Sequence, residues 1–459
     1  MVGQWVAKVL KSSPRHNWHT IFFVSSIMKT IPLFAILTIA LFSCKKNNND
    51  NAGNHRLADS SMVLTRGMYL WNKYIPANFN ARQYGDPNEL MEAIREYSKE
   101  PGFSSPVDRW SFAMLKSEWD DLSSGIGGDF GLNVFFLSTD DLRVSYVEKQ
   151  SPAGKAGIQR SWRIHKINNL SNITTASANA VVQAVYQSNS GTFTFSRPTG
   201  ADTTITLKAA SYQERPLLLD SIYTTNSTKT GYFVFNSFLG DTNQIKNEIA
   251  RVFNRFDNEN VQDVIVDLRY NGGGYVLLQT LLANYLVPVA GNNGVMLTEQ
   301  FNDDNAQFDE TIRFTKKGTL NLNRLFVIVS QQTASASELL INSLKPYMNV
   351  QLIGPSRTHG KPVGFFPLPV YDWYIFPVSF RTVNKNGEGS YFNGMSLNHQ
   401  VMDGLDKPWG DAQENCLASA LQFIKTGAYA RVGARISGAV IEENTRLGAT
   451  KFKGAIEMK

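Results

Sequence analysis

The stretch QQTASASEL at residues 331–339, followed by THGK at residues 358–361, carries the strongest signal in this chain. It places Ser335 in a turn of small residues at the start of an expected helix, and Lys361 on a later glycine turn. A serine hydroxyl is a weak nucleophile until a base removes its proton, and a lysine amine can be that base where burial lowers its pKa. The pair therefore predicts a serine hydrolase with a lysine as general base.

Both residues also have a purely structural interpretation. Ser335 and Glu338 match the S-x-x-E capping box, so the serine could simply cap its helix. Lys361 could be a solvated lysine on a turn. Against this, a helix N-terminus favours developing negative charge beside Ser335, and Phe365 and Phe366 could give the lysine an apolar setting.

The segments around the serine turn alternate strands with helices. An apolar strand at 325–329 leads straight into the turn, and a second strand is expected at 264–268. The apolar residues within 245–256 fall on one face of a helix, with Asp241 or Thr242 as its N-cap. Strands that alternate with helices predict an α/β core with parallel pairing.

A glycine-rich turn, DLRYNGGG at residues 267–274, follows the second strand. Glycines allow a backbone to present its N–H groups to a ligand, as an oxyanion hole requires. The turn could equally be a strand-to-helix connection that a network of Asp267 and Arg269 stabilises. Taken alone, the motif leaves both interpretations open.

Residues 125–210 resemble a PDZ domain. The resemblance rests on the strand-like FGLNVF at 130–135, SPAGKAGI at 151–158 and IHKIN at 164–168, although Ser161-Trp162-Arg163 replaces the usual Gly-Asp. It implies that an extended peptide is added as a strand, with loop N–H groups holding a C-terminal carboxylate. By position, that loop is Phe130, Gly131 and Leu132. Gly131 could instead be a glycine needed only for strand entry.

The combined motifs resemble the carboxyl-terminal processing peptidases, also called tail-specific proteases. The matching residues are DLRxNxGG at 267–274, TASASE at 333–338, Ile353-Gly354 and Gly360-Lys361, and the resemblance spans about residues 59–426. It implies a crotonase-like α/β catalytic core with an inserted PDZ-like β domain and a small helical N-terminal domain. It also implies peptide-bond cleavage by a Ser–Lys dyad without a cofactor.

The resemblance assigns roles by position. Ser335 becomes the nucleophile, Lys361 the general base, and the backbone N–H groups of Gly273 and Ala336 the oxyanion hole. The chain departs from the family in two respects. The spacing between serine and lysine is one residue longer than usual, because of an extra residue within 355–359. Phe365 stands where many members have a glutamine that orients the lysine.

Other catalytic chemistries have less support in the sequence. His359, His165 or His399 could serve as a base for Ser335 only with an orienting carboxylate. No spacing such as H-E-x-x-H indicates a metal, so no metal is expected, and the resemblance implies no cofactor. Cys416 lies in a helix-like run and is interpreted as a small core residue.

The N-terminus carries an apolar run, IPLFAILTIALFS at residues 31–43, after a basic start at Met28. The run is too short to span a bilayer but suits the core of a signal peptide. Its end, LFSC, resembles a bacterial lipobox. The resemblance implies that Cys44 is lipidated and anchors the protein to a membrane. The alternative is a plain hydrophobic leader with an incidental cysteine.

The chain has 459 residues and a net charge of +6, with dispersed basic residues that do not favour a nucleic-acid partner. The length allows two to four domains. The predicted segments are an upstream extension and signal peptide (1–44), a flexible tether (45–58), a helical N-terminal domain (59–124), the PDZ-like domain (125–210), the catalytic domain (211–426) and an unassigned tail (427–459).

Together these features predict a lipid-anchored serine endopeptidase of the bacterial cell envelope, on the periplasmic or surface face of the outer membrane. Its partners would be protein or peptide substrates captured by their free C-termini. One alternative is a non-catalytic peptide-binding lipoprotein that retains the fold, which Phe365 favours. Another is a crotonase-like enzyme acting on thioesters, which would need a coenzyme A site.

Overall fold

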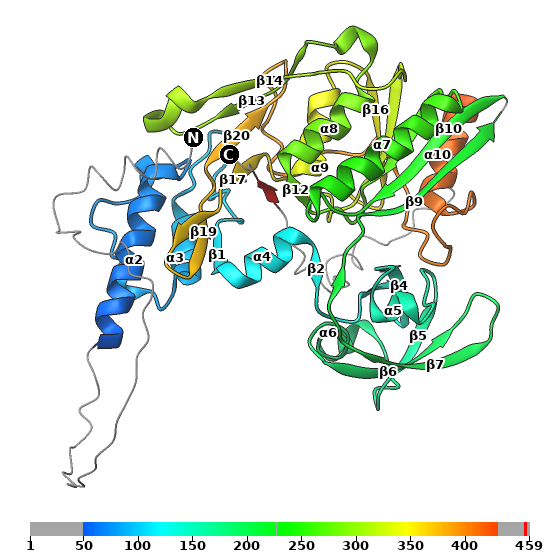
Figure 1. The fold of residues 1–459 in the computed structure, drawn as a ribbon, viewed down its shortest axis with the longest axis horizontal. Coiled ribbons are helices and arrows are strands. Elements are labelled where there is room, and N and C mark those ends of the chain that lie inside the picture. Colours follow the sequence, from blue (N-terminus) through cyan, green and yellow to red (C-terminus); the bar gives the residue numbers. More distant parts are fainter. Residues whose placement is uncertain (1–48, 226, 430–453, 457–459) are drawn as a thin grey trace, which may run out of the picture.

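The computed structural model describes residues 49–225, 227–429 and 454–456 (Figure 1). The predicted signal peptide with Cys44 lies outside the described residues, as does most of the tail 427–459. None of the described helices is long and apolar enough to cross a bilayer.

A mostly parallel sheet forms the centre of residues 211–426. Its strand order is β21-β16-β15-β11-β10-β9, and only the pairing of β9 with β10 is antiparallel among these described strands. The central strands are apolar runs buried on both faces, as is typical of parallel sheets covered by helices. This confirms the predicted mixed α/β core. The bounds are β9 Leu217–Thr225, β10 Thr228–Phe235, β11 Asp263–Asp267, β15 Arg324–Ile328, β16 Asn349–Gly354 and β21 His399–Gln400.

Helices cover both faces of this sheet. Val264 and Val266 of β11 belong to the same apolar cluster as the buried residues of α7, α8 and α9. Ile265, which points the other way, packs in a second cluster with Cys416 of α10. Cys416 is therefore the core residue that the sequence predicted. The helices are α7 Thr242–Asn258, capped by Asp241 as predicted, α8 Val276–Leu286, α9 Ala336–Leu344 and α10 Asn415–Thr426.

A second sheet lies beside α8 and α9 and has the order β12-β22-β17-β20-β13-β14. Its members come from widely separated parts of the chain. The bounds are β12 Gly273–Tyr275, β13 Val295–Gln300, β14 Glu310–Arg313, β17 Val363–Phe365, β20 Phe380–Val383 and β22 Gly454–Ile456. Between β13 and β14 lies the 3-10 helix η6 Asp303–Phe308, and η5 Val289–Gly291 precedes β13.

The N-terminal part is only partly helical. The sequence predicted a helical domain over 59–124, with helix-spaced apolar residues across 110–122. Residues 112–115 instead form a strand, β1, and the helix α4 begins at Lys116. The reason is tertiary: β1 pairs antiparallel with β19, and the ring of Phe112 stacks on that of Phe376, with centroids 4.4 Å apart. The elements are α2 Asn49–Met68, η1 Asn72–Tyr74, η2 Ala81–Gln83, α3 Pro87–Ile94, η3 Arg95–Tyr97, β1 Phe112–Leu115 and α4 Lys116–Ser124, with β18 Leu368–Val370 and β19 Trp373–Phe376 completing the sheet.

The helix α2 also extends further than the sequence indicated. It begins at Asn49, inside the segment 45–58 for which the sequence predicted a flexible tether. Residues 45–48 lie outside the described part of the chain.

Residues 125–210 form a separate antiparallel sheet with its own apolar core (Figure 1). The strand order β3-β4-β5-β6-β7 follows the sequence, and α6 packs on this core. A short ladder of β2 with β8 joins the two connections to the rest of the molecule. The bounds are β2 Ile126–Gly127, β3 Leu132–Ser138, β4 Asp141–Val147, α5 Pro152–Lys155, β5 Arg163–Ile167, η4 Thr175–Ser177, α6 Ala178–Tyr186, β6 Ser190–Ser196, β7 Asp202–Lys208 and β8 Tyr212–Gln213.

Candidate active site

Ser335 occupies the sharp turn between β15 and α9. Its backbone has φ 56° and ψ −110°, a conformation that L-residues rarely adopt and that costs about 1–3 kcal/mol. The turn is fastened to the glycine-rich segment: Thr333 Oγ1 donates to the carbonyl of Leu268 at 2.8 Å, and the Ala334 N–H donates to the carbonyl of Asn271 at 3.0 Å. These bonds hold Ser335 in its strained geometry.

Ser335 and Glu338 take up the predicted capping-box arrangement at the start of α9. The Ser335 side chain is 1% exposed, and among the described residues its oxygen nevertheless makes no full hydrogen bond. A buried hydroxyl at a strained strand-to-helix turn is the arrangement of a nucleophile elbow. The geometry therefore favours the nucleophile interpretation over the structural one.

Glu338 joins the serine turn to the lysine turn. Its buried carboxylate accepts hydrogen bonds from the backbone N–H of Ser335 at 2.8 Å, Gly360 at 2.7 Å and Lys361 at 2.8 Å, and from Thr358 Oγ1 at 2.6 Å. Burial raises the pKa of Glu338, while these four donors act in the opposite direction. In the sequence, Glu338 is recognisable only as a capping partner of Ser335. Its position in the motif TASASE gave no sign of the contacts across 358–361.

The Lys361 side chain lies in an aromatic setting. It is 1% exposed, and its Nζ lies 3.7 Å from the ring centroid of Phe365 and 5.8 Å from that of Trp110. Burial lowers the pKa of Lys361 well below its usual value, although the negative charges of Asp108 and Glu338 oppose this. The structure thus excludes the solvated turn lysine.

Trp110 is a site residue that the sequence did not reveal. It comes from the N-terminal part, and its backbone N–H donates to Asp108 at 2.8 Å. Its indole Nε1 donates to Nε2 of His359 at 2.9 Å. That nitrogen of His359 is therefore directed at Trp110.

The other two histidines have different surroundings. His165 lies on β5, with Nε2 3.4 Å from the carboxylate of Asp202. His399 lies on β21 and stacks on Tyr429, with ring centroids 4.3 Å apart. The recorded neighbours of these two histidines are thus Asp202 and Tyr429, and Ser335 is not among them.

The two backbone N–H groups predicted to form the oxyanion hole differ in their hydrogen bonding. The Gly273 N–H is donated to Asn271 Oδ1 at 2.9 Å, so it is already engaged. Asn271 is itself held by a bond from its Nδ2 to the carbonyl of Phe235 at 2.9 Å. Ala336 is the first residue of α9, where a helix supplies no backbone acceptor for the N–H group. The Ala336 N–H is therefore one of the first donors of α9 and lies next to Ser335 in the sequence.

The Asp267–Arg269 network exists and is larger than the sequence indicated. Arg269 Nη2 lies 2.7 Å from Asp267, and its Nη1 lies 2.7 Å from Asp403 and 2.8 Å from Glu414. Asp403 also accepts from Arg160 at 2.6 Å, and Arg160 lies in the connection between α5 and β5 of the separate antiparallel sheet. Charges this deeply buried persist only when paired. The network fixes the strand end that leads to the glycine turn and links it to that sheet.

Two backbone groups of the predicted carboxylate-binding loop already have hydrogen-bond partners. The Gly131 N–H donates to Asp129 at 2.7 Å, and the Phe130 carbonyl accepts from Ala153 at 2.9 Å. Gly131 has φ 65°, and a Cβ there would lie 2.1 Å from the Cβ of Ser151. Phe130 and Leu132 are buried in the core of this sheet. Gly131 is therefore a glycine because Ser151 lies too close to leave room for a side chain.

No group of three or more His, Cys, Asp or Glu residues that could hold a metal ion is found among the described residues.

Comparison with known proteins defines the class to which this fold and site belong. Residues 229–395 match the family described as Peptidase family S41, and residues 66–112 match the Peptidase S41 N-terminal domain. The first match contains Ser335 and Lys361, and the second contains Trp110. Residues 229–395 are therefore a peptidase family S41 domain, as the chain's resemblance to the carboxyl-terminal processing peptidases predicted.

The curated relatives are named as serine proteases. The probable CtpA-like serine protease of Staphylococcus aureus (strain COL) is 23% identical over 345 residues. That alignment covers 74% of this chain and 64% of the relative, so the chain spans just under two thirds of the relative's length. The protein of the same name from Staphylococcus epidermidis is 23% identical over 372 residues, which is 76% of this chain and 68% of the relative.

A solved structure shares the fold. The crystal structure of a protein from Bacteroides fragilis, provisionally described as an S41 protease, superposes with a TM-score of 0.65 and 22% identity. The match covers 80% of this chain and 97% of that one. At this identity the likeness concerns the fold alone.

Proposed function

We propose that the protein is a serine endopeptidase in which Ser335 attacks the peptide bond and Lys361 removes its proton. The observation that carries the proposal is the strained, buried Ser335, whose hydroxyl makes no full hydrogen bond and whose turn Glu338 joins to the turn of a desolvated lysine. The family S41 domain and the names of the relatives agree with it.

The reaction needs Lys361 as a neutral amine, and burial favours that form. Ser335 Oγ would add to the carbonyl carbon while its proton passes to Nζ. The N–H of Ala336 would stabilise the oxyanion, joined by that of Gly273 once Asn271 releases it. Lys361 would then protonate the leaving amine, and water would hydrolyse the acyl-enzyme.

The remaining parts of the proposal rest on resemblance. The core would be crotonase-like, and the sheet of β3 to β7 would be a PDZ-like domain that captures substrate C-termini. The protein would be anchored in the bacterial cell envelope through a lipid on Cys44. Radiolabelled palmitate incorporation into the wild type but not a Cys44→Ala variant would support the anchor, and equal labelling of both would refute it.

The decisive experiment compares the wild type, Ser335→Ala and Lys361→Ala for cleavage of an unfolded protein with an apolar C-terminus. Loss of cleavage in both variants, with unchanged circular dichroism, supports the dyad. Cleavage that survives Ser335→Ala would refute it.

A second function, peptide binding without turnover, is favoured by two observations. The Gly273 N–H is engaged by Asn271, and Phe365 replaces the glutamine that the resembled family places beside its lysine. Binding of the C-terminal peptide by a wild type that cleaves nothing would support this second function.

A further inference from the structure

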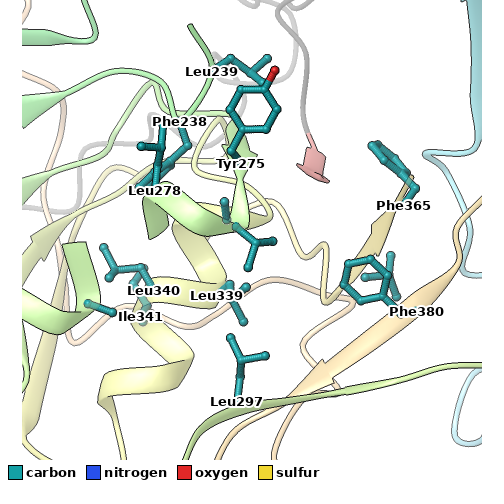
Figure 2. Packing of buried hydrophobic residues seen from close by; sticks show 14 of the residues in the cluster. Phe238, Leu239, Tyr275, Leu278, Leu297, Leu339, Leu340, Ile341, Phe365 and Phe380 are labelled. Atoms are coloured by element: carbon teal, nitrogen blue, oxygen red, sulfur yellow. The ribbon is translucent and has the colours of Figure 1, made fainter. Parts of the chain in front are cut away.

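The second sheet contains a strand from a distant part of the chain. β22, Gly454–Ile456, lies between β12 and β17 and runs parallel to both. It is the short dark-red arrow beside these strands in Figure 1, and the same strand, in pale red, lies between Tyr275 and Phe365 in Figure 2. β12 begins at Gly273, and β17 begins two residues after Lys361. The strand therefore passes between the two segments next to the candidate reacting groups.

The far edge of β12 is already paired. The Gly273 carbonyl accepts from the N–H of Phe238 at 2.8 Å, and the Tyr275 N–H donates to the carbonyl of Phe238 at 2.9 Å. Because successive residues of a strand direct their backbone groups to opposite edges, those of Gly274 face β22.

The far edge of β17 is paired in the same way. The Gly364 carbonyl accepts from the N–H of Ser379 at 2.8 Å, and Gly364 pairs with Phe380 of β20. The backbone groups of Val363 and Phe365 therefore face β22. The register aligns Ala455 with both Gly274 and Gly364, so Ala455 directs its own N–H and carbonyl toward β17.

The gap between these two edges has the width of one strand. Two strands that pair with the same neighbour lie about 9.6 Å apart, twice the usual spacing. An empty gap would leave the backbone groups of Gly274, Val363 and Phe365 that face it without a strand to pair with, as at any open sheet edge. These two edges thus form a built site for a single extended polypeptide.

We propose that this gap, called here the strand slot, binds one extended polypeptide through main-chain hydrogen bonds on both edges, and that Gly454–Ile456 occupies it in cis, in competition with substrate. The register places Gly454 opposite Gly273, where β12 leaves the glycine turn. A substrate in the same register would run along the two segments that follow the glycine turn and Lys361. The role of the slot in substrate binding rests on the proposed peptidase function, whereas its occupancy by the tail does not.

The test measures binding rather than turnover, on the full chain carrying Ser335→Ala. The probe is the peptide TKFKGAIEMK, residues 450–459, labelled with fluorescein at its N-terminus, and the readout is fluorescence anisotropy. Ala455→Pro in the protein removes the N–H directed at β17 and is incompatible with a central strand. Ala455→Ser keeps that N–H and is the matched control.

A tethered segment competes at an effective concentration in the millimolar range, so the Ala455→Pro protein should bind the probe at least about tenfold more tightly than the other two proteins. A probe that itself carries proline at the position of Ala455 should not bind. Equal affinity of all three proteins, or binding of the proline probe, would overturn the proposal.

Hydrogen exchange gives a second, independent readout. The Phe365 N–H should exchange faster in the Ala455→Pro protein, and added probe should restore its protection. Unchanged protection would also overturn the proposal. Tighter binding to the Ala455→Pro protein, combined with no cleavage by an Ala455→Pro protein that retains Ser335, would refute the peptidase function and leave the slot intact.

Discussion

The Nζ atom of Lys361 lies 3.7 Å from the centroid of the Phe365 ring. The face of an aromatic ring stabilises a cation, whereas burial stabilises the neutral amine. Phe365 therefore partly offsets the desolvation of Lys361. It contacts the lysine in place of the glutamine that the resembled family carries at this position.

Replacing Phe365 with leucine should lower the pKa of Lys361 further. A cation–π contact of about 0.5–2 kcal/mol corresponds to roughly 0.4–1.5 pKa units, so the half-maximal pH of activity should fall by that amount. The pH profile of kcat/KM measures it. Phe366→Leu is the control, because Phe366 packs against Phe301 and Phe380 instead. An upward shift for Phe365→Leu would contradict the expectation.

Lys361 should make both activity and stability rise with pH. Its folded pKa lies well below the value of about 10.4 in an unfolded chain. Between the two values the unfolded chain binds more protons, so the free energy of unfolding contributed by this group increases with pH and levels off above the unfolded pKa. Cleavage rates and urea unfolding from about pH 5 to 10 test this. Lys361→Met should abolish activity and flatten that part of the stability curve, and an unchanged curve would argue against a desolvated amine.

Glu338→Gln should damage the site although the side chain keeps its shape. The amide has one acceptor oxygen, while its NH₂ group faces N–H donors that the carboxylate had satisfied. We expect a loss of roughly 2–4 kcal/mol in the free energy of unfolding and a fall in kcat, measured by urea titration and peptide cleavage. Glu310→Gln, on the exposed strand β14, should change neither quantity by much. Wild-type kcat in Glu338→Gln would show that the two turns do not depend on this carboxylate.

Two substitutions of Ser335 should separate the effect of its backbone strain from the effect of its hydroxyl group. Ser335→Ala and Ser335→Gly both lack the hydroxyl, so neither should cleave substrate. Only glycine accepts φ 56° and ψ −110° without steric cost, so Ser335→Gly should be more stable than Ser335→Ala by about 1 kcal/mol or more. Thermal unfolding of the pair measures this difference. Equal stability would mean that the turn relaxes when the hydroxyl is removed.

Arg160 should couple the separate antiparallel sheet to the core. Its side chain is 2% exposed, donates to Asp403 at 2.6 Å and to the hydroxyl of Tyr270 at 3.1 Å, and lies over the ring of Trp409. Arg160→Met should cost about 3 kcal/mol, because Asp403 still has Arg269 as a partner.

The control for this coupling is Arg163→Met. Arg163 pairs with Asp141 on the same sheet but is 44% exposed, so its loss should cost at most about 1 kcal/mol. Hydrogen exchange in β3 to β7 and urea unfolding compare the two variants. A similar effect of both substitutions would mean that the buried network does not hold the sheet in place.

The sequence predicted the core elements well because their signal is local. Strands β10, β11 and β15 are short runs of apolar residues, and the buried face of α7 repeats at helical spacing. The same kind of signal failed at β1, where the helix-like spacing of 110–122 was overridden by pairing with β19.

The parts of the site that the sequence missed depend on distant contacts. Trp110 reaches Lys361 from the N-terminal part, and Glu338 receives hydrogen bonds from 358–361 only after both turns have folded. β22 is three residues long and lies in a stretch without periodicity, so nothing local marks it as a strand. Motifs identified Ser335 and Lys361 as candidates, but only the fold shows what surrounds them.

The ladder of β1 with β19 has a consequence for the order of events during synthesis. Residues 112–115 have no partner until residues 373–376 have been made. At a translation rate of about 5–20 residues per second, the wait is roughly 15–50 s. During this time the aromatic side chains of the early segment are exposed to other chains and to chaperones. Closure of so long a loop is also slow, so the segment that matches the S41 N-terminal domain completes its pairing only after residues 373–376 are available.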